Sequence, residues 1–314
     1  MHKAKYLFLY LRTGGGHLAP ARSVAEYLKQ NYADSIEPVL IDGFAEAPAY
    51  ARFIVEDGYR ILQSKAKWYY EMLYATNKII SLAKINKYLV SRQVLPYLER
   101  KLLEEKPEKI VIFHFFLIKP VYELVRKHKL DPKIITVVTD PFTAHPIWFV
   151  RKDQDWIIFS DRLKDYLIRK NIPAGRLHVF PFILNDRFNH PVPKEELPKL
   201  KNRMGFSEDQ RIILIVGGGD GIPKGEKIVR RIVQSLPRVQ IAVVCGKNKA
   251  LFDQLMHMKE KRKLDRLKIY GYVDFIYELI NISDVVITKC GASTFMEILM
   301  MHKIPVVNSY LWEQ

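Results

Sequence analysis

Ten residues near the end of the chain bring together several groups that can do chemistry. The stretch from Thr288 to Glu297 reads Thr-Lys-Cys-Gly-Ala-Ser-Thr-Phe-Met-Glu, after an apolar run and before a helical pattern. This order predicts a strand, a glycine turn and a helix whose first amides form an anion site. Lys289 adds a cation there, and Ser293 and Thr294 add hydroxyl donors. Glu297 can accept two hydrogen bonds from a ribose, so a nucleoside diphosphate is the ligand that matches this layout.

The same stretch also fits a purely structural interpretation. Thr294 to Glu297 has the Ser/Thr-x-x-Glu pattern of a capping box, in which the glutamate bonds back to the first amide of the helix. These residues alone favour the capping box, because such short motifs often recur without a ligand. The rest of the chain has to decide between the two.

A histidine at a glycine-rich helix start is the second candidate site. Gly14-Gly15-Gly16-His17 follows an apolar strand pattern and precedes a helical one. The positive end of a helix disfavours an imidazolium, so a histidine there stays neutral, as a general base requires. A histidine that merely caps its helix fits the local sequence equally well. His114, inside an apolar run, is predicted instead to be a core residue.

Two further segments give weaker signals. Gly217-Gly218-Gly219 opens another glycine turn between a strand and a helix, without the Gly-Lys-Ser/Thr ending of a Walker loop or a full dinucleotide fingerprint. His145 and Trp148 follow a strand end among prolines, where an irregular segment is well placed to form the wall of a binding site.

Composition limits the class of protein. The 314 residues, 48% apolar and 27% charged, suit a globular protein of about two domains. No apolar run approaches the roughly 18 residues that span a bilayer. With only Cys245 and Cys290 there is no disulfide framework or zinc spacing, which indicates a reducing cytoplasm. The net charge of +16 favours nucleic acid, an anionic membrane or phosphorylated substrates as partners, but no nucleic-acid motif is present.

Strand, turn and helix patterns alternate along most of the chain, and they predict an α/β fold with two Rossmann-like domains. A strand at 6–11 leads through the glycines into a helix at about 19–30, and the rhythm returns from residue 109. Residues 181–205, rich in proline and charge, are expected to be the linker. We place the domains at residues 1–185 and 186–314. The second pattern stops just past a strand, so we expect that domain to be incomplete.

A helical, basic and aromatic insert interrupts the first domain between about residues 50 and 105. Between Arg60 and Arg92, seven Lys and Arg residues accompany a single acid, Glu71. Such a segment fits a membrane-docking surface, and a packed core with a solvated lysine face fits it equally well. The aromatic residues of the insert are Tyr59, Trp68, Tyr69, Tyr70, Tyr74 and Tyr88.

Six segments spread along nearly the whole chain carry motifs of one enzyme family. They are Gly14 to His17, Val138-Thr139-Asp140, His145-Pro146-x-Trp148, Val243 to Asn248, Gly271-Tyr272-Val273 and Thr288-Lys289-x-Gly291. Together they resemble the GT-B-fold glycosyltransferases that use UDP-sugars and lipid acceptors. The resemblance is closest to the diacylglycerol glycosyltransferases, namely the plant monogalactosyldiacylglycerol synthases and the bacterial processive diacylglycerol glucosyltransferases.

This resemblance implies roles for the candidate residues. His17 would be the base that deprotonates the acceptor hydroxyl, with Gly15, Gly16, His145 and Trp148 as acceptor-site candidates. It also favours the ribose interpretation of Glu297 over the capping box. No metal or other cofactor is expected. The residues implied on the donor side are Gly217, Gly218 and Gly219 as the lining, Val273 at the uracil, Lys289, Gly291, Ser293 and Thr294 at the diphosphate, Glu297 at the ribose and Gln314 at the sugar.

The predicted function is therefore inverting transfer of a hexose from a UDP-sugar to diacylglycerol or a related lipid. The enzyme would be peripheral, at the cytoplasmic face of an anionic membrane. The alternatives are the lipid-linked N-acetylglucosamine transferase of peptidoglycan assembly, whose pattern residues 291–297 also fit, and a non-catalytic membrane-binding protein of the same fold. One departure stands out: where the family usually has Gly-Ile-Pro-Ile-Arg, residues 179–183 read Val-Phe-Pro-Phe-Ile and lack the basic group.

Overall fold

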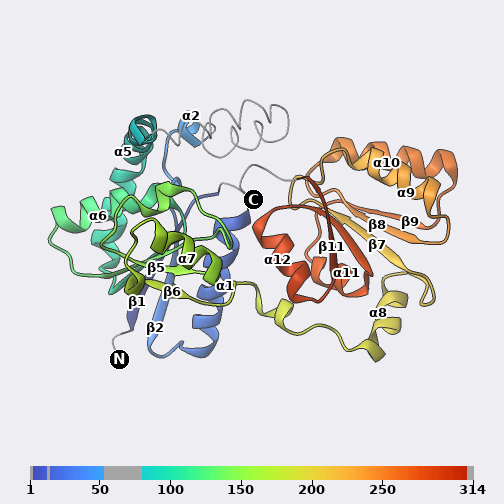
Figure 1. The fold of residues 1–314 in the computed structure, drawn as a ribbon, viewed down its shortest axis with the longest axis horizontal. Helices are drawn as coiled ribbons and strands as arrows, with labels where there is room; N and C mark the ends of the chain where they lie inside the picture. Colours follow the sequence, from blue (N-terminus) through green and yellow to red (C-terminus); the bar gives the residue numbers. More distant parts are fainter. Residues whose placement is uncertain (1–2, 13–14, 53–79, 310–314) are drawn as a thin grey trace. The chain divides into compact units, whose positions relative to one another are not determined.

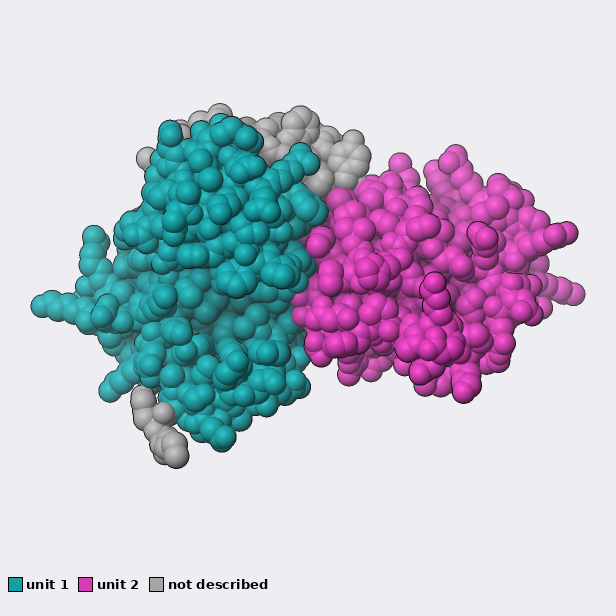
Figure 2. All heavy atoms as spheres, turned by 60° about the horizontal axis from the view of Figure 1, so that its bottom comes forward, with its two compact units in different colours: residues 1–183, 312–314 teal, residues 184–311 magenta. Residues whose placement is uncertain are grey.

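The chain forms two compact units (Figure 2), and each is built around its own parallel sheet (Figure 1). The computed structural model describes residues 3–12, 15–52 and 80–309. Unit 1 runs from the first strand to Ile183, and unit 2 begins at Leu184. The predicted α/β class is confirmed. Its physical basis is that neighbouring parallel strands must be joined by long crossover connections, which the helices provide.

Unit 1 has a six-stranded sheet in the order β2-β1-β3-β4-β5-β6. The chain leaves β1 to add β2 on one side and then returns to add β3 on the other, so β1 lies inside the sheet. The alternating side chains of β1 are buried on both faces, Leu7 and Leu9 in one cluster and Phe8 and Tyr10 in another. The elements are β1 (Ala4–Tyr10), α1 (Gly15–Asn31), β2 (Ile36–Asp42), α2 (Ala49–Arg52), α5 (Ile80–Glu105), β3 (Lys109–Ile112), η2 (Phe115–Leu117), α6 (Ile118–Lys127), β4 (Lys133–Val137), η3 (Pro146–Phe149), β5 (Asp155–Ile158), α7 (Asp161–Arg169), η4 (Ala174–Arg176) and β6 (Leu177–Val179).

Two sequence expectations in unit 1 need comment. Helix α1 begins at Gly15, earlier than the expected start near residue 19, so Gly15, Gly16 and His17 form its first turn. Glycine is a poor helix former, which is why the sequence pattern did not signal this start. In the insert, residues 53–79, with most of its aromatic side chains, lie outside the described residues, and Tyr88 belongs to helix α5.

Unit 2 has a five-stranded parallel sheet in the order β11-β10-β7-β8-β9. Along β7, Leu214 and Val216 pack in one core cluster, whereas Ile215 packs in the other, because successive side chains point to opposite faces. Helices α9 and α10 cover the Ile215 face, and α8, α11 and α12 cover the other (Figure 1). The elements are η5 (Asp186–Asn189), η6 (Lys194–Glu196), α8 (Leu197–Arg203), β7 (Ile212–Val216), α9 (Gly225–Ser235), β8 (Gln240–Val244), α10 (Lys249–Arg262), β9 (Leu267–Tyr270), α11 (Ile276–Ile282), β10 (Val285–Lys289), α12 (Ala292–Met300) and β11 (Ile304–Ser309).

The expectation that residues 181–205 form only a linker is wrong. Residues from Leu184 onward belong to unit 2, and Phe188 and Leu200 are buried in its core, 6% and 7% exposed. Tyr277 Oη donates to the His190 carbonyl at 2.8 Å, and the Val192 amide donates to Asn281 Oδ1 at 2.8 Å. Proline and charge dominate the composition of this segment, and its few apolar residues are too irregularly spaced to show a period.

Truncating Leu200 tests this correction. We expect Leu200→Ala to lower the free energy of unfolding by about 2–5 kcal/mol, because it deletes methyl groups from a packed core. The exposed neighbour Lys199 supplies the control: Lys199→Ala should change it by no more than about 0.5 kcal/mol. Urea unfolding followed by far-UV circular dichroism measures both. If the two variants were equally stable, Leu200 would not contribute to the core, and the segment would be a linker as the sequence predicted.

Candidate active site

The first group of candidate residues lies where the strand order of unit 1 reverses. β1 and β3 are neighbours, yet the chain visits β2 between them. Ligands of open α/β sheets bind at such switch points, outside the carboxyl ends of the strands. His17 follows β1, Phe113 and His114 follow β3, and Thr139 follows the next strand, β4. The fold therefore brings these residues together at one edge of the sheet.

The His17 imidazole is held through one of its two nitrogens. Nδ1 lies 2.7 Å from the Phe113 carbonyl oxygen, and Thr139 Oγ1 lies 3.0 Å from the same nitrogen. A carbonyl can only accept, so we assign the proton to Nδ1, which leaves Nε2 with the basic lone pair. No described residue hydrogen-bonds to Nε2. Burial lowers the pKa of His17 to about 4, against the opposing effect of the Phe113 carbonyl. His17 is thus a neutral, oriented base at physiological pH.

His114 packs against this base as a second neutral imidazole. Its ring centroid lies 4.4 Å from that of His17, and its Nδ1 accepts a hydrogen bond from the Phe116 amide at 3.2 Å. Burial lowers the pKa of His114 well below its usual value, and the neighbouring His17 adds to the shift. The predicted core histidine is confirmed: the side chain is 2% exposed and caps η2.

The segment after β4 packs close to His17. Trp148 is fully buried, and its indole N–H donates to Asp140 Oδ2 at 3.0 Å. Its ring centroid lies 6.2 Å from that of His17. His145 Nδ1 accepts from the Ile147 amide at 3.1 Å and so begins η3. Burial raises the pKa of Asp140 to about 6, although the Trp148 hydrogen bond opposes this. Trp148 therefore packs near His17 and fixes the orientation of the Asp140 carboxylate.

In unit 2 the glycine turn after β7 is fixed by backbone contacts. A Cβ on Gly217 would lie 2.2 Å from the Gly221 carbonyl oxygen, and Gly218 and Gly221 have φ of +73° and +74°. The Gly219 carbonyl accepts from the Lys247 amide at 2.7 Å. A Cβ on Gly219, in contrast, would meet no atom within 4 Å. Most of these glycines are thus needed by the turn itself, whereas the space beside Gly219 is open.

Lys289 lies next to both glycine turns of unit 2. Strands β7 and β10 are neighbours at the switch point of this sheet, so their carboxyl ends adjoin. The Cε of Lys289 lies 3.8 Å from the Cβ position of Gly218 and 3.9 Å from that of Gly291. Burial lowers the pKa of Lys289, and the nearby Asp220 partly offsets the effect. A partly desolvated cation beside a helix N-terminus suits an anionic ligand.

The start of α12 excludes the capping box. The helix begins at Ala292 with Gly291 as its N-cap and without a side-chain cap, so Thr294 lies inside the helix. The described structure shows no hydrogen bond from any residue to the Glu297 carboxylate, and burial raises the Glu297 pKa to about 7. Ser293 Oγ is likewise buried without a hydrogen-bond partner among the described residues. A buried polar group normally has a partner, so Ser293 Oγ is poised for a ligand, and the shifted pKa of the half-buried Glu297 makes its carboxylate a second candidate.

The remaining candidates are distributed as follows. Val273 follows β9 at the same carboxyl edge of the unit 2 sheet and packs on its core. Gln314 lies outside the described residues. Over the described ranges, no three His, Cys, Asp or Glu side chains come together as metal ligands. None of the helices in the described parts of the chain is long and apolar enough to cross a membrane.

Three contributors to the His17 site had no role assigned from the sequence. They are the Phe113 carbonyl, the Thr139 hydroxyl and the Asp140 carboxylate, which bonds Trp148. The position of Thr139 and Asp140 directly after a buried strand was the available signal, because neighbouring parallel strands end at one edge. Every residue has a backbone carbonyl, so the residue type at position 113 does not predict the contact with His17. That contact follows from the register of β1 against β3, which only the structure gives.

Two doubly wound units with such sites at their switch points make up the GT-B fold of nucleotide-sugar glycosyltransferases. The family described as monogalactosyldiacylglycerol (MGDG) synthase matches residues 17–181, and the glycosyltransferase family 28 C-terminal domain matches residues 212–310. The chain belongs to the MGDG synthase family, which confirms the resemblance seen in the sequence.

Individual proteins agree with this assignment. A processive diacylglycerol beta-glucosyltransferase of Bacillus cytotoxicus is 29% identical over 306 residues, which cover 96% of this chain and 75% of that protein. A glycosyltransferase of Rickettsia africae has a similar fold, with a TM-score of 0.56 at 17% identity, covering 99% of this chain and 81% of that one. HepE of Anabaena in complex with UDP-glucose gives 0.53 at 15% identity, covering 96% and 80%.

The open space beside Gly219 separates a binding role from a structural one. We expect Gly219→Ala to leave stability within about 1 kcal/mol of the unaltered protein, since no atom obstructs the methyl group and Gly219 does not have a positive φ. Its affinity for UDP-glucose should fall by about tenfold, because the methyl group overfills the ligand space. Isothermal titration calorimetry and thermal unfolding measure the two effects. Gly217→Ala is the contrasting variant and should lose stability outright. Unchanged affinity in Gly219→Ala would remove this turn from the donor site.

Proposed function

We propose that this protein transfers a hexose from a UDP-sugar to the free hydroxyl of diacylglycerol or a closely related lipid, with inversion at the anomeric carbon. Membership of the MGDG synthase family and the matching diacylglycerol glucosyltransferases support this substrate pair. The observation that carries the chemistry is the oriented, neutral His17, whose Nε2 has no hydrogen-bond partner among the described residues.

On the acceptor side, His17 acts as the general base. Nε2 takes the proton of the lipid hydroxyl while the hydroxyl oxygen bonds to the anomeric carbon and the bond to the UDP oxygen breaks. The Nδ1–H bond to the Phe113 carbonyl keeps the ring in the tautomer that this step needs, and it stabilises the imidazolium that forms. Gly16 lies at the first turn of α1 with open space at its Cβ position, which leaves room for an acceptor.

On the donor side, α12 and Lys289 hold the diphosphate. The amides at the N-terminus of α12 and the Lys289 ammonium stabilise the negative charge that grows on the leaving UDP. Ser293 Oγ, buried without a partner in the described part of the chain, donates to the diphosphate, and Thr294 adds a second hydroxyl. Glu297 accepts the ribose hydroxyls, and Val273 contacts the uracil through its backbone. Gly217 to Gly219 line this site.

Inversion follows from the groups available. A double displacement would need an ionised carboxylate as nucleophile next to the anomeric carbon. Asp140 directly follows Thr139, and its Oδ2 accepts a hydrogen bond from the indole N–H of the fully buried Trp148, so this carboxylate is already engaged in holding Trp148. A single displacement needs only one base, and His17 supplies it.

Membrane association belongs to the same proposal. A diacylglycerol acceptor lies in a bilayer, and the net charge of +16 attracts the enzyme to an anionic surface. We place the reaction at the cytoplasmic face, where UDP-sugars are available. The basic segment between residues 50 and 105, for which a membrane-docking surface is one of the two interpretations open from the sequence, is the docking element in this proposal.

A transfer assay tests the proposed function. The protein is mixed with vesicles that contain diacylglycerol and with UDP-glucose, UDP-galactose or UDP-N-acetylglucosamine in turn, and the lipids are read by mass spectrometry. We expect a hexose-sized mass gain with one of the two hexose donors. N-acetylhexosamine transfer to a polyprenyl-linked acceptor, with none to diacylglycerol, would establish the peptidoglycan alternative instead.

His17→Ala is the matched control in this assay. Loss of the base should lower kcat by about 10²–10⁴-fold with UDP-glucose affinity unchanged. Burial lowers the pKa of His17 to about 4, so protonation of this base should reduce kcat/KM only as the pH falls towards 4, and not already near 6.5. Turnover by His17→Ala at the unaltered rate would remove His17 from the mechanism.

The half-buried Glu297 predicts a pH dependence of donor binding. Burial raises the pKa of Glu297 to about 7, so the carboxyl group is protonated below that pH. The ribose hydroxyls donate to the ionised carboxylate, so binding requires that this proton be lost. UDP-glucose affinity should therefore fall below pH 7 by up to about tenfold per unit, and level off above it. Titration calorimetry between pH 5.5 and 8.5 measures this. Glu297→Gln should bind more weakly and without this dependence, and a flat profile for the unaltered protein would contradict a ribose role.

A further inference from the structure

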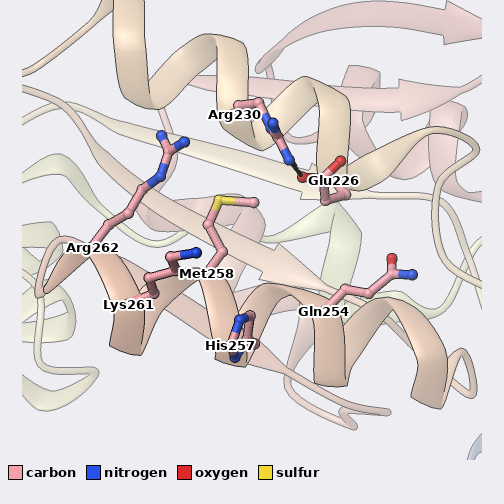
Figure 3. Close-up of a pocket in the computed structure, with 7 residues that line it drawn as sticks. All are labelled: Glu226, Arg230, Gln254, His257, Met258, Lys261 and Arg262. Atoms are coloured by element: carbon pink, nitrogen blue, oxygen red, sulfur yellow. Dashed lines mark hydrogen bonds and ion pairs between the residues drawn. The ribbon is translucent and has the colours of Figure 1, made fainter.

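The helical face of unit 2 formed by α9 and α10 contains a groove that the proposed reaction does not use. It has a volume of about 480 Å³ and is lined by side chains from both helices (Figure 3). Met258, 8% exposed, packs into the core beneath it. The residues that line the groove are distinct from those of the two glycine turns and the start of α12.

Positive charge predominates in this groove. Arg230 projects from α9, and Lys261 and Arg262 project from the last turn of α10 (Figure 3). Glu226 is the one acid that lines it, and it accepts from Arg230 Nε at 3.0 Å. Within the described part of the chain, Lys261 and Arg262 form no ion pair. His257, also on α10, lines the groove as well.

Helix electrostatics alone does not account for this arrangement. Cations in the last turn of α10 are favoured by its dipole, which explains Lys261 and Arg262 as features of one helix. Arg230 belongs to α9, and yet it lines the same groove. Three cations from two helices, with one acid that pairs with Arg230 on α9, therefore form a surface with an excess of positive charge above Met258.

The chemistry that fits this surface is a phosphate diester. Guanidinium groups bind phosphate oxygens bidentately, and a lysine ammonium adds a point charge. The groove is open and its cations are exposed, so it can contact a phosphate at a surface without enclosing a whole ligand. A bilayer presents phosphates in this way, and the proposed function, on which the choice of a lipid source rests, already brings the protein to one.

We propose that the α9–α10 groove binds the phosphate groups of anionic phospholipids. Unit 2 thereby has its own membrane contact, in addition to the one expected from the insert of unit 1. Each basic side chain near an anionic leaflet strengthens binding about fivefold at moderate ionic strength, so the three cations of the groove make a measurable contribution.

The test compares two triple variants of the intact chain that lose the same charge. The groove variant carries Arg230→Gln, Lys261→Gln and Arg262→Gln. The control variant carries Arg187→Gln, Lys194→Gln and Lys199→Gln, three exposed residues of η5, η6 and α8, away from the α9–α10 face. Binding is measured by co-sedimentation with vesicles of phosphatidylcholine containing phosphatidylglycerol, and with vesicles of phosphatidylcholine alone.

We expect the groove variant to lose about tenfold or more in affinity for the anionic vesicles, and the control variant less than about threefold. Equal losses would mean that net charge alone drives binding, and no loss in the groove variant would mean that the groove faces away from the membrane; either overturns the proposal. Inorganic phosphate at matched ionic strength should not displace the unaltered protein. Displacement would assign the groove to a small anion instead.

A micelle assay separates this inference from the proposed function. With diacylglycerol in neutral detergent micelles, the groove variant should transfer hexose at the rate of the unaltered protein, because none of its three positions belongs to the donor or acceptor site. If the unaltered protein transfers no sugar, the proposed function fails while the vesicle comparison still decides the groove. A slow groove variant in micelles would place the groove in catalysis and contradict a purely membrane role.

Discussion

Both candidate sites depend on one topological constraint. In each sheet the first strand lies inside, because the chain adds strands first on one side and then on the other. The connections leave the carboxyl ends of two adjacent strands in opposite directions, and the space between them is open to a ligand. His17 and Phe113 meet at that point in unit 1, as Lys289 and the glycine turn after β7 do in unit 2. Within each unit, the candidate residues are far apart in sequence and close together because of this reversal.

Desolvation is the second shared feature of the two sites. Burial is the largest effect on the pKa of His17, Asp140, Lys289 and Glu297, and in each case it favours the neutral form. Withdrawing such groups from water costs free energy that the fold must offset elsewhere, and the sheets' apolar cores supply it. A ligand that hydrogen-bonds to the ionised form of Glu297, or places a diphosphate beside Lys289, recovers part of that cost. Ligand binding is therefore most favourable beside the desolvated groups that lack a partner among the described residues.

The sequence was most informative where candidate site residues directly follow a buried strand. The runs before His17 and before Gly291 were readable as buried strands, so the helix N-termini behind them could be anticipated, and the α/β class with them. The sequence was least informative where the answer depends on packing. The buried Phe188 and Leu200 were concealed by a proline-rich, charged composition. The Thr294–Glu297 pattern by itself favoured a cap, and the family resemblance favoured a ligand; the helix start at Ala292 then excluded the cap. That Arg230 on α9 lines the same groove as Lys261 on α10 could not be predicted, because it depends on how each helix is rotated about its axis on the sheet.

The two sites differ in the charge they are built to receive, and this division fits a single displacement. The His17 site contains imidazoles that burial keeps neutral, His17 and His114, and it lacks a fixed cation among the residues that contact them. Such a site can take up a proton without repelling it by a permanent charge. The α12 site combines a helix N-terminus with Lys289, an arrangement that stabilises negative charge throughout the reaction. The proposed inverting transfer needs a group that takes up a proton and a group that stabilises a leaving anion, and the His17 site suits the first requirement as the α12 site suits the second.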